Sequence, residues 1–297
     1  MHHRSALLTF ILILCLCNFA QSQEFVYGFR VGLNFSTFQG PSQKDADGNE
    51  LESLDNNTGF HVGANFSYKF YESFGIRTGL LYSQRGGEYL FEGQSYQILL
   101  ADSGERVAAF GQRKDVLSVT NSYLEIPFVA YGKFFEKLEV FGGAGLNFLI
   151  GSRADGERQF NGISAINSQP VDFTVALNHL YFSDDVPTPE FIREFTMPNM
   201  ITADGEVIFI PESFNGYYDY PEKDGSIYNI VDITVLGGLA YYLNRGLFVS
   251  VSAHLGLLDV TNETYDFSKT ELNGLEYVPQ DDKDNNFFIQ ASIGFSF

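Results

Sequence analysis

An all-β fold, an eight-stranded antiparallel transmembrane β-barrel, is predicted by three features of this 297-residue chain. Apolar residues recur at every second position over eight separate segments, which is typical of strands with two unlike faces. The connections between these segments alternate between short turns and long polar loops. The less apolar face is mainly Gly, Ser and Asn, which suits a crowded barrel interior better than a water-exposed surface.

The eighth predicted strand, at the end of the chain, shows the alternation most clearly. Its apolar positions are Phe287, Ile289, Ala291, Ile293, Phe295 and Phe297. The eight predicted strands cover residues 25–35, 59–70, 75–89, 121–134, 138–151, 228–242, 247–258 and 286–297. In a barrel of this kind, lipid covers the apolar face of every strand.

The N-terminus is typical of a secretory signal peptide. Residues 1–22 combine a short basic lead, an apolar run and small residues near the end. The apolar run is about eleven residues long, whereas a membrane-spanning helix needs about 20. We therefore expect residues 23–297 to form the mature barrel domain. That domain contains no cysteine, because Cys15 and Cys17 both lie in the predicted signal peptide. Disulfides, iron–sulfur clusters and a thiol nucleophile are thereby excluded.

The long loops are predicted to lie at one end of the barrel and the short turns, with both termini, at the other. The long loops cover residues 36–58, 90–120, 152–227 and 259–285. They hold 30 of the 37 acidic residues and 10 of the 18 basic residues, so the net charge of −19 belongs to the loops. Such a surface argues against nucleic acid as a partner, because phosphates would be repelled. The third long loop, residues 152–227, has room for extra hairpins or a short helix, and we expect any function specific to this protein to lie there.

A soluble, lipocalin-like barrel would also show alternating strands. Aromatic residues at the short-turn end favour the membrane protein, because outer-membrane barrels carry aromatic girdles at both membrane interfaces. The predicted girdle contains Phe25, Tyr27, Tyr68, Phe70, Tyr71, Phe74, Phe134, Tyr241, Phe295 and Phe297.

Charged residues at inward positions predict a polar plug inside the barrel. Eight strands leave a lumen that side chains can fill, so a diffusion pore is not expected. The plug residues are Arg30, Lys69, Arg77, Arg85, Glu125, Lys133, Asp232 and His254. Buried charges must pair, and the two acids of this set are the expected partners of the three arginines. A conducting or proton-relay role is the alternative for the same residues.

Two histidines are the candidates for catalysis. His179 lies near Asp184 and Asp185 in the third long loop, and His254 shares an inward strand face with Ser250 and Ser252. No nucleophile elbow, HExxH or similar motif surrounds either histidine. The sequence therefore predicts neither an enzyme nor a cofactor.

The stretch DADGNELES, which starts at Asp45, begins like a calcium-binding loop. Asp45, Asp47 and Asn49 place side-chain oxygens at alternate positions. The pattern is incomplete, because Gly48 comes at its fourth position and Asn56 occupies the position of the usual glutamate. An ordinary Asp-Gly turn is the alternative.

Several stretches resemble the PorT-type outer-membrane β-barrel family. They are GFRVGLNFSTFQG (28–40), GFHVGANFSYKF (59–70), GIRTGLLYSQRGGEY (75–89), YLEIPF (123–128) and GGAGLNFLIGSRADGE (142–157). The family takes its name from a member involved in protein secretion and maturation, but most relatives share only the barrel, so that role is not carried over. The terminal Phe297 resembles the signal by which barrel-assembly machinery recognises its clients.

We therefore expect an integral outer-membrane protein of a Gram-negative cell, with both termini in the periplasm and a structural, anchoring or protein-interaction role. We expect three partners: outer-membrane lipid, the barrel-assembly machinery during biogenesis, and an outer-membrane or secretion-system protein. The alternatives are ligand binding at the cell surface by the third long loop and a narrow channel. A membrane-embedded enzyme is the remaining hypothesis.

Overall fold

The computed structural model describes residues 24–297 apart from 46, 102, 167, 189–195, 204–205 and 281. The predicted signal peptide, residues 1–22, lies outside the described residues. Strands dominate the fold, and the described helical structure is a single 3-10 turn, η2 (Glu263–Tyr265). Among the described residues, no helix has the length and apolar character needed to cross a membrane.

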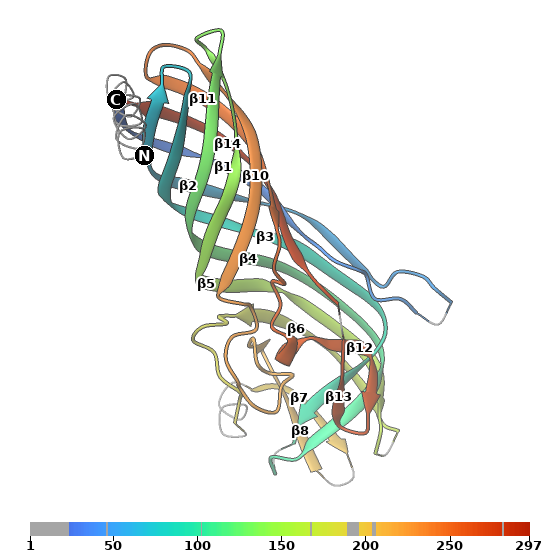
Figure 1. The fold of residues 1–297 in the computed structure, drawn as a ribbon. Coiled ribbons are helices and arrows are strands. Elements are labelled where there is room, and N and C mark those ends of the chain that lie inside the picture. The colour runs from blue at the N-terminus through green and yellow to red at the C-terminus, as the bar shows by residue number, and fades with distance from the viewer. Residues whose placement is uncertain are drawn as a thin grey trace, which may run out of the picture.

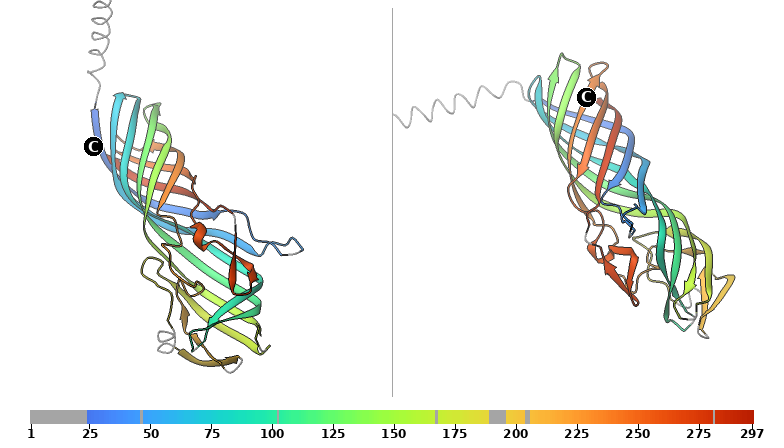
Figure 2. Two further views of the ribbon diagram at one scale, coloured as in Figure 1. Left: turned by 60° about the horizontal axis from the view of Figure 1, so that its bottom comes forward. Right: turned by 90° about the vertical axis from the view of Figure 1, so that its right-hand side faces the viewer.

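Eight strands form a closed antiparallel ring, as the sequence predicts (Figure 1). In order around the ring they are β1 (Glu24–Gln39), β2 (Glu52–Tyr71), β3 (Phe74–Leu100), β4 (Arg106–Phe134), β5 (Leu138–Ser164), β10 (Val231–Tyr242), β11 (Leu247–Gly256) and β14 (Asn285–Ser296). Pairing of β5 with β10 and of β1 with β14 closes the ring. The three hairpin turns lie at the same end as the start of β1 and the C-terminus, and we call it the short-turn end (Figure 2).

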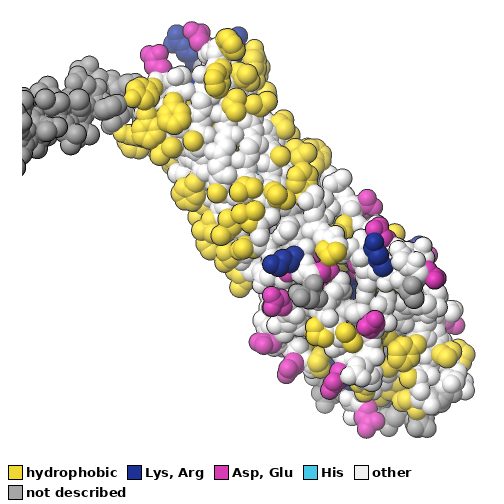
Figure 3. All heavy atoms as spheres, turned by 45° about the vertical axis from the view of Figure 1, so that its right-hand side comes forward, with side chains coloured by type: hydrophobic (Ala, Val, Ile, Leu, Met, Phe, Trp, Pro, Cys, Tyr) yellow, Lys and Arg dark blue, Asp and Glu magenta, His cyan; other side chains and the backbone are white. Residues whose placement is uncertain are grey.

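The outer face of the ring is apolar. Along β1, exposed Phe25, Tyr27, Phe29, Val31, Leu33 and Phe35 alternate with less exposed or buried residues. The hydrophobic side chains in Figure 3 cover the half of the molecule near the short turns, whereas acidic side chains gather mainly on the other half. Aromatic rings line the short-turn rim, where Phe25 packs on Tyr68 at 5.0 Å and Phe295 on Phe297 at 5.0 Å between ring centroids. The apolar half is the segment that matches a lipid environment.

Three ring strands continue far beyond the apolar half. Residues 90–120, predicted as a long loop, instead prolong β3 and β4, which stay paired up to Leu100 and Arg106. β5 continues likewise and pairs with β6 (Pro170–His179), which in turn contacts β9 (Ser213–Phe214). The alternation of apolar and polar residues is weaker here, because both faces of these strands carry polar residues. We call this part of the molecule the extension.

The third long loop forms extra hairpins, one of the two alternatives that the sequence leaves open. β5 and β6 make one, and β7 (Thr196–Ala203) pairs with β8 (Glu206–Pro211) in another. The inward face of β6 packs against the segment around β8 and β9 in a hydrophobic core. This core includes Phe160, Val171, Phe173, Val175, Leu177, Ile208 and Phe214. A small hairpin of β12 (Phe267–Asn273) and β13 (Glu276–Pro279) from the fourth long loop stands beside β3.

Pro127 does not mark a bulge in β4, although a proline inside a strand favours that interpretation. Gly145 of β5 lies opposite it, and the register of β4 with β5 is unbroken there on both sides. The ladder toward β3 lacks a pair at Ile126 and Pro127, as expected for a residue without an N–H group. The register shift of β4 falls between Ser122 and Tyr123 instead.

Candidate functional site

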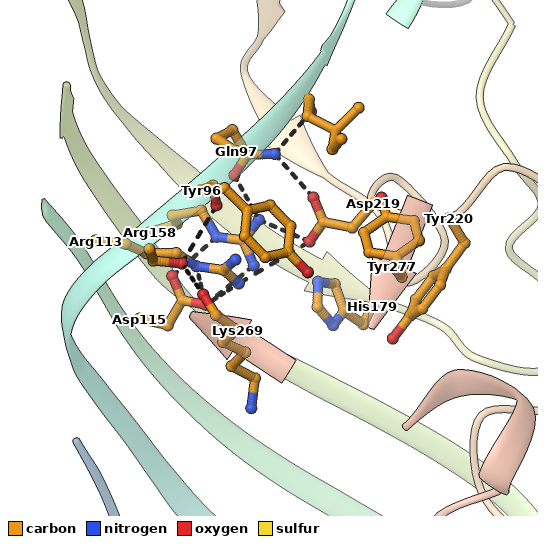
Figure 4. Close-up of polar contacts among 12 residues, drawn as sticks. Tyr96, Gln97, Arg113, Asp115, Arg158, His179, Asp219, Tyr220, Lys269 and Tyr277 are labelled. Atoms are coloured by element: carbon orange, nitrogen blue, oxygen red, sulfur yellow. Dashed lines mark hydrogen bonds and ion pairs between the residues drawn. The ribbon is translucent and has the colours of Figure 1, made fainter. Parts of the chain in front are cut away.

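A chamber of about 240 Å³ lies within the extension. One side is built by the prolonged strands β3, β4 and β5 with the end of β6. The opposite side comes from two loop segments, residues 215–228 and 261–284. Figure 4 shows side chains from both sides converging on this space.

A network of four charged residues forms the floor of the chamber. Arg113 and Asp115 point inward from alternate positions of β4, and Arg158 lies directly opposite Asp115 on β5. The Arg158 guanidinium donates to Asp115 Oδ1 through Nε at 2.8 Å and to Asp219 Oδ2 through Nη1 at 2.7 Å. The Arg113 guanidinium donates to Asp115 Oδ2 at 2.5 Å (Figure 4).

These pairs fix the ionisation of the network. Burial opposes the charge on Asp115, but the Arg113 and Arg158 guanidinium groups outweigh it and hold the pKa of Asp115 well below its usual range. The Asp219 side chain is 30% exposed, and its partial burial opposes the charge, but Arg158 and then Arg113 lower its pKa. Burial opposes the charge on Arg158 as well, yet Asp115 and Asp219 raise its pKa. The network is therefore a self-neutralising group, with two positive and two negative charges.

His179 faces the chamber from the end of β6 as a neutral imidazole. Its Nδ1 lies 2.8 Å from the Tyr181 hydroxyl. Burial and then the charge of Arg158 lower its pKa to about 4. Asp184, its predicted catalytic neighbour, accepts the backbone N–H groups of Leu180 and Gly216 at 2.7 and 2.9 Å instead. The two residues therefore do not form a hydrogen-bonded acid–base pair.

Aromatic rings make up most of the remaining chamber wall. The lining includes Phe38, Phe267 and seven tyrosines: Tyr89, Tyr96, Tyr181, Tyr220, Tyr228, Tyr265 and Tyr277. Several rings pack on one another, as in the Phe267–Tyr277 stack at 5.0 Å and the Tyr220–Tyr265 edge contact at 4.9 Å. Some of the tyrosine hydroxyls already donate hydrogen bonds to protein oxygens, as Tyr96 does to the Ser268 carbonyl at 2.7 Å. The wall is thus held in place by its own contacts.

Three further acids line the chamber without a basic partner at ion-pair distance among the described residues. They are Asp266, Asp282 and Asp284. Burial, followed by the hydrogen bond and charge of Asp282, raises the pKa of Asp266 to about 8. Burial and then Asp282 raise the pKa of Asp284 to about 6. The chamber therefore has one charge-balanced side and one side with excess negative charge.

The structure places the predicted plug residues in two layers inside the ring. Arg30, Arg85, Glu125, Asp232 and His254 are buried in the barrel. Lys69 and Lys133 lie at the short-turn mouth, where Lys69 pairs with Glu24 at 2.7 Å and the Lys133 ammonium stands 3.8 Å from the Tyr242 ring centroid. Phe297, the predicted assembly signal, is exposed at that rim.

The partners of the three barrel arginines differ in part from the predicted ones. Arg30 does approach Glu125, at 3.9 Å. Arg77 instead binds Glu139 through two hydrogen bonds of 2.7 and 2.9 Å. Glu139 is fully buried on β5, two strands along the ring from Arg77 on β3, a neighbour that alternation within one strand cannot identify.

Arg85 forms no ion pair with a described residue. Its guanidinium lies 4.1 Å from the Tyr123 ring centroid and 4.3 Å from that of Phe288, and it donates to Asn147 Oδ1 at 2.8 Å. Cation–π contacts therefore replace the predicted carboxylate. His254 stacks on Phe288 and meets Ser252 Oγ at 2.9 Å, buried within the barrel.

The predicted calcium ligands lie on an exposed hairpin between β1 and β2, away from the chamber lining. Asp45 Oδ1 accepts the backbone N–H groups of Asp47 and Asn49 at 2.9 and 2.8 Å, which is the geometry of an Asx turn. Within the described ranges, no three His, Cys, Asp or Glu side chains are placed to hold a metal ion.

The sequence interpretation missed the chamber residues because they lie in stretches read as loops. One signal was present: Arg113 and Asp115 occupy alternate positions on the inner face of β4, and Asp155 and Glu157 do so on the outer face of β5. Charges at a period of two indicate a strand with polar faces, not an irregular loop.

Comparison with family models supports the fold. A family model for the outer membrane protein beta-barrel domain matches residues 19–262. Solved structures that resemble the chain include Ail, the attachment invasion locus protein of Yersinia pestis, with 12% identity over 92% of this chain and 99% of that one, at a TM-score of 0.33. OprG from Pseudomonas aeruginosa gives 11% identity, 93% and 97% coverage and a TM-score of 0.34.

Neisserial surface protein A gives 9% identity, 93% and 100% coverage and a TM-score of 0.35. Among curated proteins, none matches the chain. The family match covers more than half of the sequence, and the closed ring with its apolar outer face agrees with it. The chain belongs to the family of the outer membrane protein beta-barrel domain and is an integral protein of the outer membrane.

Proposed function

We propose that this protein is an outer-membrane anchor that binds a small ligand outside the cell. The observation that carries the proposal is the chamber of about 240 Å³ in the extension. Its walls are aromatic, and its polar groups are already fixed by contacts such as the Arg158 pairs with Asp115 and Asp219. A preformed concave site with aromatic walls and polar groups held in fixed positions is typical of small-molecule binding sites.

The proposed orientation places the short turns and both termini in the periplasm and the extension outside. Outer-membrane barrels have short periplasmic turns and long extracellular loops. The extension, with most of the acidic residues, is the part that suits water, and the apolar half is the part that suits lipid.

The barrel itself acts in this proposal as an anchor rather than a pore. Arg77, Glu139 and Tyr242 join at one level of its lumen, and Arg85, Tyr123 and Phe288 fill another. A narrow channel is the second candidate, favoured by buried polar atoms that lack a protein partner, such as Asp232 Oδ1 and His254 Nδ1. Single-channel conductance of the refolded protein separates the two, since the anchor should stay silent.

Two further statements go with the proposed anchor. The first is a role in binding another protein, and the second is membership of the PorT-type family. The stretches from residue 28 to residue 157 that resemble that family lie on β1 to β5, the strands that carry both the barrel and the extension. The β7–β8 hairpin is a separate two-stranded sheet, and its edges are where we propose that a partner protein pairs. Crosslinking in intact cells, with and without residues 196–207 replaced by a Gly-Ser turn, tests this contact and leaves the core residue Ile208 in place.

Binding is favoured over catalysis by the position of the two histidines. His254 and Ser252 are buried in the barrel, and His254 stacks on Phe288. His179 lies at the chamber beside Tyr181, and Asp184 is occupied by backbone N–H groups. Ser252 Oγ meets His254 Nε2 at 2.9 Å, but the pair is buried in the barrel, and no described residue orients the imidazole through Nδ1. Neither histidine therefore belongs to an accessible set of nucleophile, base and orienting group.

The proposal is tested by filling the chamber. Ser42 lines it from the loop after β1, and Ser42→Trp would occupy the space. Thr174→Trp on the exposed outer face of β6 is the matched control, and the natural chain contains no tryptophan. In nanodiscs, a panel of anionic, neutral and cationic small molecules is screened by saturation-transfer NMR. Binding that is lost in Ser42→Trp and kept in Thr174→Trp supports the proposal, and binding that both variants retain, or no binding at all, contradicts it.

A further inference from the structure

The side of the chamber with excess negative charge indicates the chemical class of the ligand. Six acidic and three basic side chains line the chamber. The three bases are all paired with three of the acids: Arg113 and Arg158 with Asp115 and Asp219, and Lys269 with Glu52 at 2.9 Å. The remaining acids are Asp266, Asp282 and Asp284.

The nearby lysines do not neutralise these three acids. Lys269 is committed to Glu52, and Lys283 is exposed to solvent. Gln280 donates to Asp282 Oδ2 at 2.5 Å, and Thr261 donates weakly to Asp284 at 3.5 Å. Both donors are uncharged. A carboxylate that is partly buried without a cation beside it is destabilised. Its affinity for a proton or for another positive charge is therefore higher.

Aromatic rings adjoin the same acids. Asp266 lies in the chain between Tyr265 and Phe267, and all three residues line the chamber. Phe267 stacks on Tyr277, which stands 6.0 Å from Tyr96 between ring centroids. The Tyr220 ring contacts Tyr265 and Tyr277, and Figure 4 shows Tyr96, Tyr220 and Tyr277 converging from three separate segments. Such faces attract a cation through the ring quadrupole, and aromatic cages are used to bind quaternary ammonium groups.

The size of the chamber indicates an organic cation rather than a bare metal ion. Its volume of about 240 Å³ is several times the roughly 30 Å³ that one water molecule occupies in the liquid. The described residues include no group of three acidic, His or Cys side chains arranged for a metal. Aromatic walls would also contribute little to a hard cation, which prefers oxygen ligands.

We infer that the chamber binds a small organic cation, with an ammonium or quaternary ammonium group beside Asp266, Asp282 and Asp284 and its body against the rings of Tyr220, Phe267 and Tyr277. This inference rests on the proposed function, since it names the class of ligand for the same chamber. The raised pKa of Asp266, about 8, agrees with a site that lacks its positive charge.

Choline and its uncharged isostere 3,3-dimethyl-1-butanol are the probes for this inference. Binding to the full-length mature protein in nanodiscs is measured by titration calorimetry at pH 8.5. We expect choline to bind at least about tenfold more tightly than the isostere, since the two differ only in the positive charge. The double variant Asp266→Asn, Asp282→Asn should weaken choline binding by at least about tenfold. Asp172→Asn on the outer face of β6 is the matched control and should leave it unchanged.

Equal affinity for choline and the isostere, or choline binding that survives the double variant, overturns the inference. If choline fails to bind while a neutral or anionic molecule of the screening panel binds and is lost in Ser42→Trp, the inference falls and the proposed function stands. If no probe of any charge binds, both fall.

Discussion

The barrel lumen and the chamber are built from the same residue types, but they use them differently. In the lumen, Arg77 and Glu139 meet directly, and Arg85 lies between two rings, so side chains occupy the space. In the chamber, Arg158 pairs with Asp115 and Asp219 on the floor, and tyrosine rings line the open volume above them. A closed ring of eight strands brings opposite walls within side-chain reach. In the extension, the prolonged strands face loops and the small β12–β13 hairpin instead of a closed ring, so the space between the two sides can stay open.

Removal of the central arginine of the chamber floor should have the largest effect. Arg158→Leu removes the closest basic partner of Asp219 and leaves only Arg113 beside Asp115 and Asp219, and breaking a buried ion pair destabilises by about 3–5 kcal/mol. We expect the extension to lose protection in hydrogen exchange while the barrel keeps its heat-modifiable gel mobility. Arg153→Leu, exposed on the same strand, is the control. Equal protection in both variants would show that the network does not hold the extension together.

The corresponding substitution in the lumen, Glu139→Gln, should lower the free energy of unfolding by less. Glu139→Gln keeps one acceptor for Arg77 but removes the charge, and a hydrogen bond to a charged group contributes about 1.5–3 kcal/mol. The free energy of unfolding of the barrel in urea, followed by gel mobility, should fall by that amount. Glu136→Gln in the exposed β4–β5 turn should leave it unchanged. If the Glu139→Gln barrel is as stable as the natural one, packing alone sets the lumen.

The acidic side of the chamber should make the extension weaker as pH rises. A carboxyl whose pKa is raised to about 8, as for Asp266, holds its proton more tightly in the folded than in the unfolded chain. Its stabilising effect is complete below about pH 4 and is lost as pH rises through 8. The charged groups that face it are Asp282, Asp284 and Asp259.

Hydrogen exchange of the extension at pH 5.5 and pH 9 checks this dependence. Asp266→Asn should flatten it, and choline should restore protection at pH 9 in the natural chain. Protection that increases toward pH 9 would contradict the expected sign.

The exposed hairpin at Asp45 should show the smallest effect. Its carboxylate already accepts two backbone N–H groups, so the turn needs no ion. Limited proteolysis between β1 and β2 should be the same with calcium as with a chelator, and Asp47→Ala should not alter it. Protection by calcium that Asp47→Ala removes would establish a metal site there.

The barrel could be predicted from the sequence because its signal is local. Lipid on one side and small residues on the other give β1, β2, β11 and β14 a clear period of two. The prolonged parts of β3 to β5 lack this contrast, since water covers their outer face and charges such as Arg113 lie on their inner face. The alternation of apolar and polar residues is therefore too weak to predict strands beyond the apolar half.

The chamber could not be assembled from the sequence because it depends on register. Asp115 meets Arg158 only because the two are paired across β4 and β5, and Asp219 arrives from a loop about 60 residues further on. The same limit explains the missed Arg77–Glu139 pair, which joins β3 to β5 over the intervening strand β4. Polar partners on one face of one strand can be predicted from the sequence. Partners on different strands can be predicted only when the register of each strand with its neighbour is known.

The seam between β1 and β14 has a consequence for the order of assembly. It pairs Gly28 with Ser296, which lie near the two ends of the described chain, whereas β3, β4 and β5 pair with their neighbours in sequence. Loop-closure entropy rises with the length of the chain that is closed, so the seam should form last. Until then the sheet has two open edges, each a template for another strand. The alternating C-terminal strand is thus the element whose loss would leave an unfinished barrel prone to aggregate.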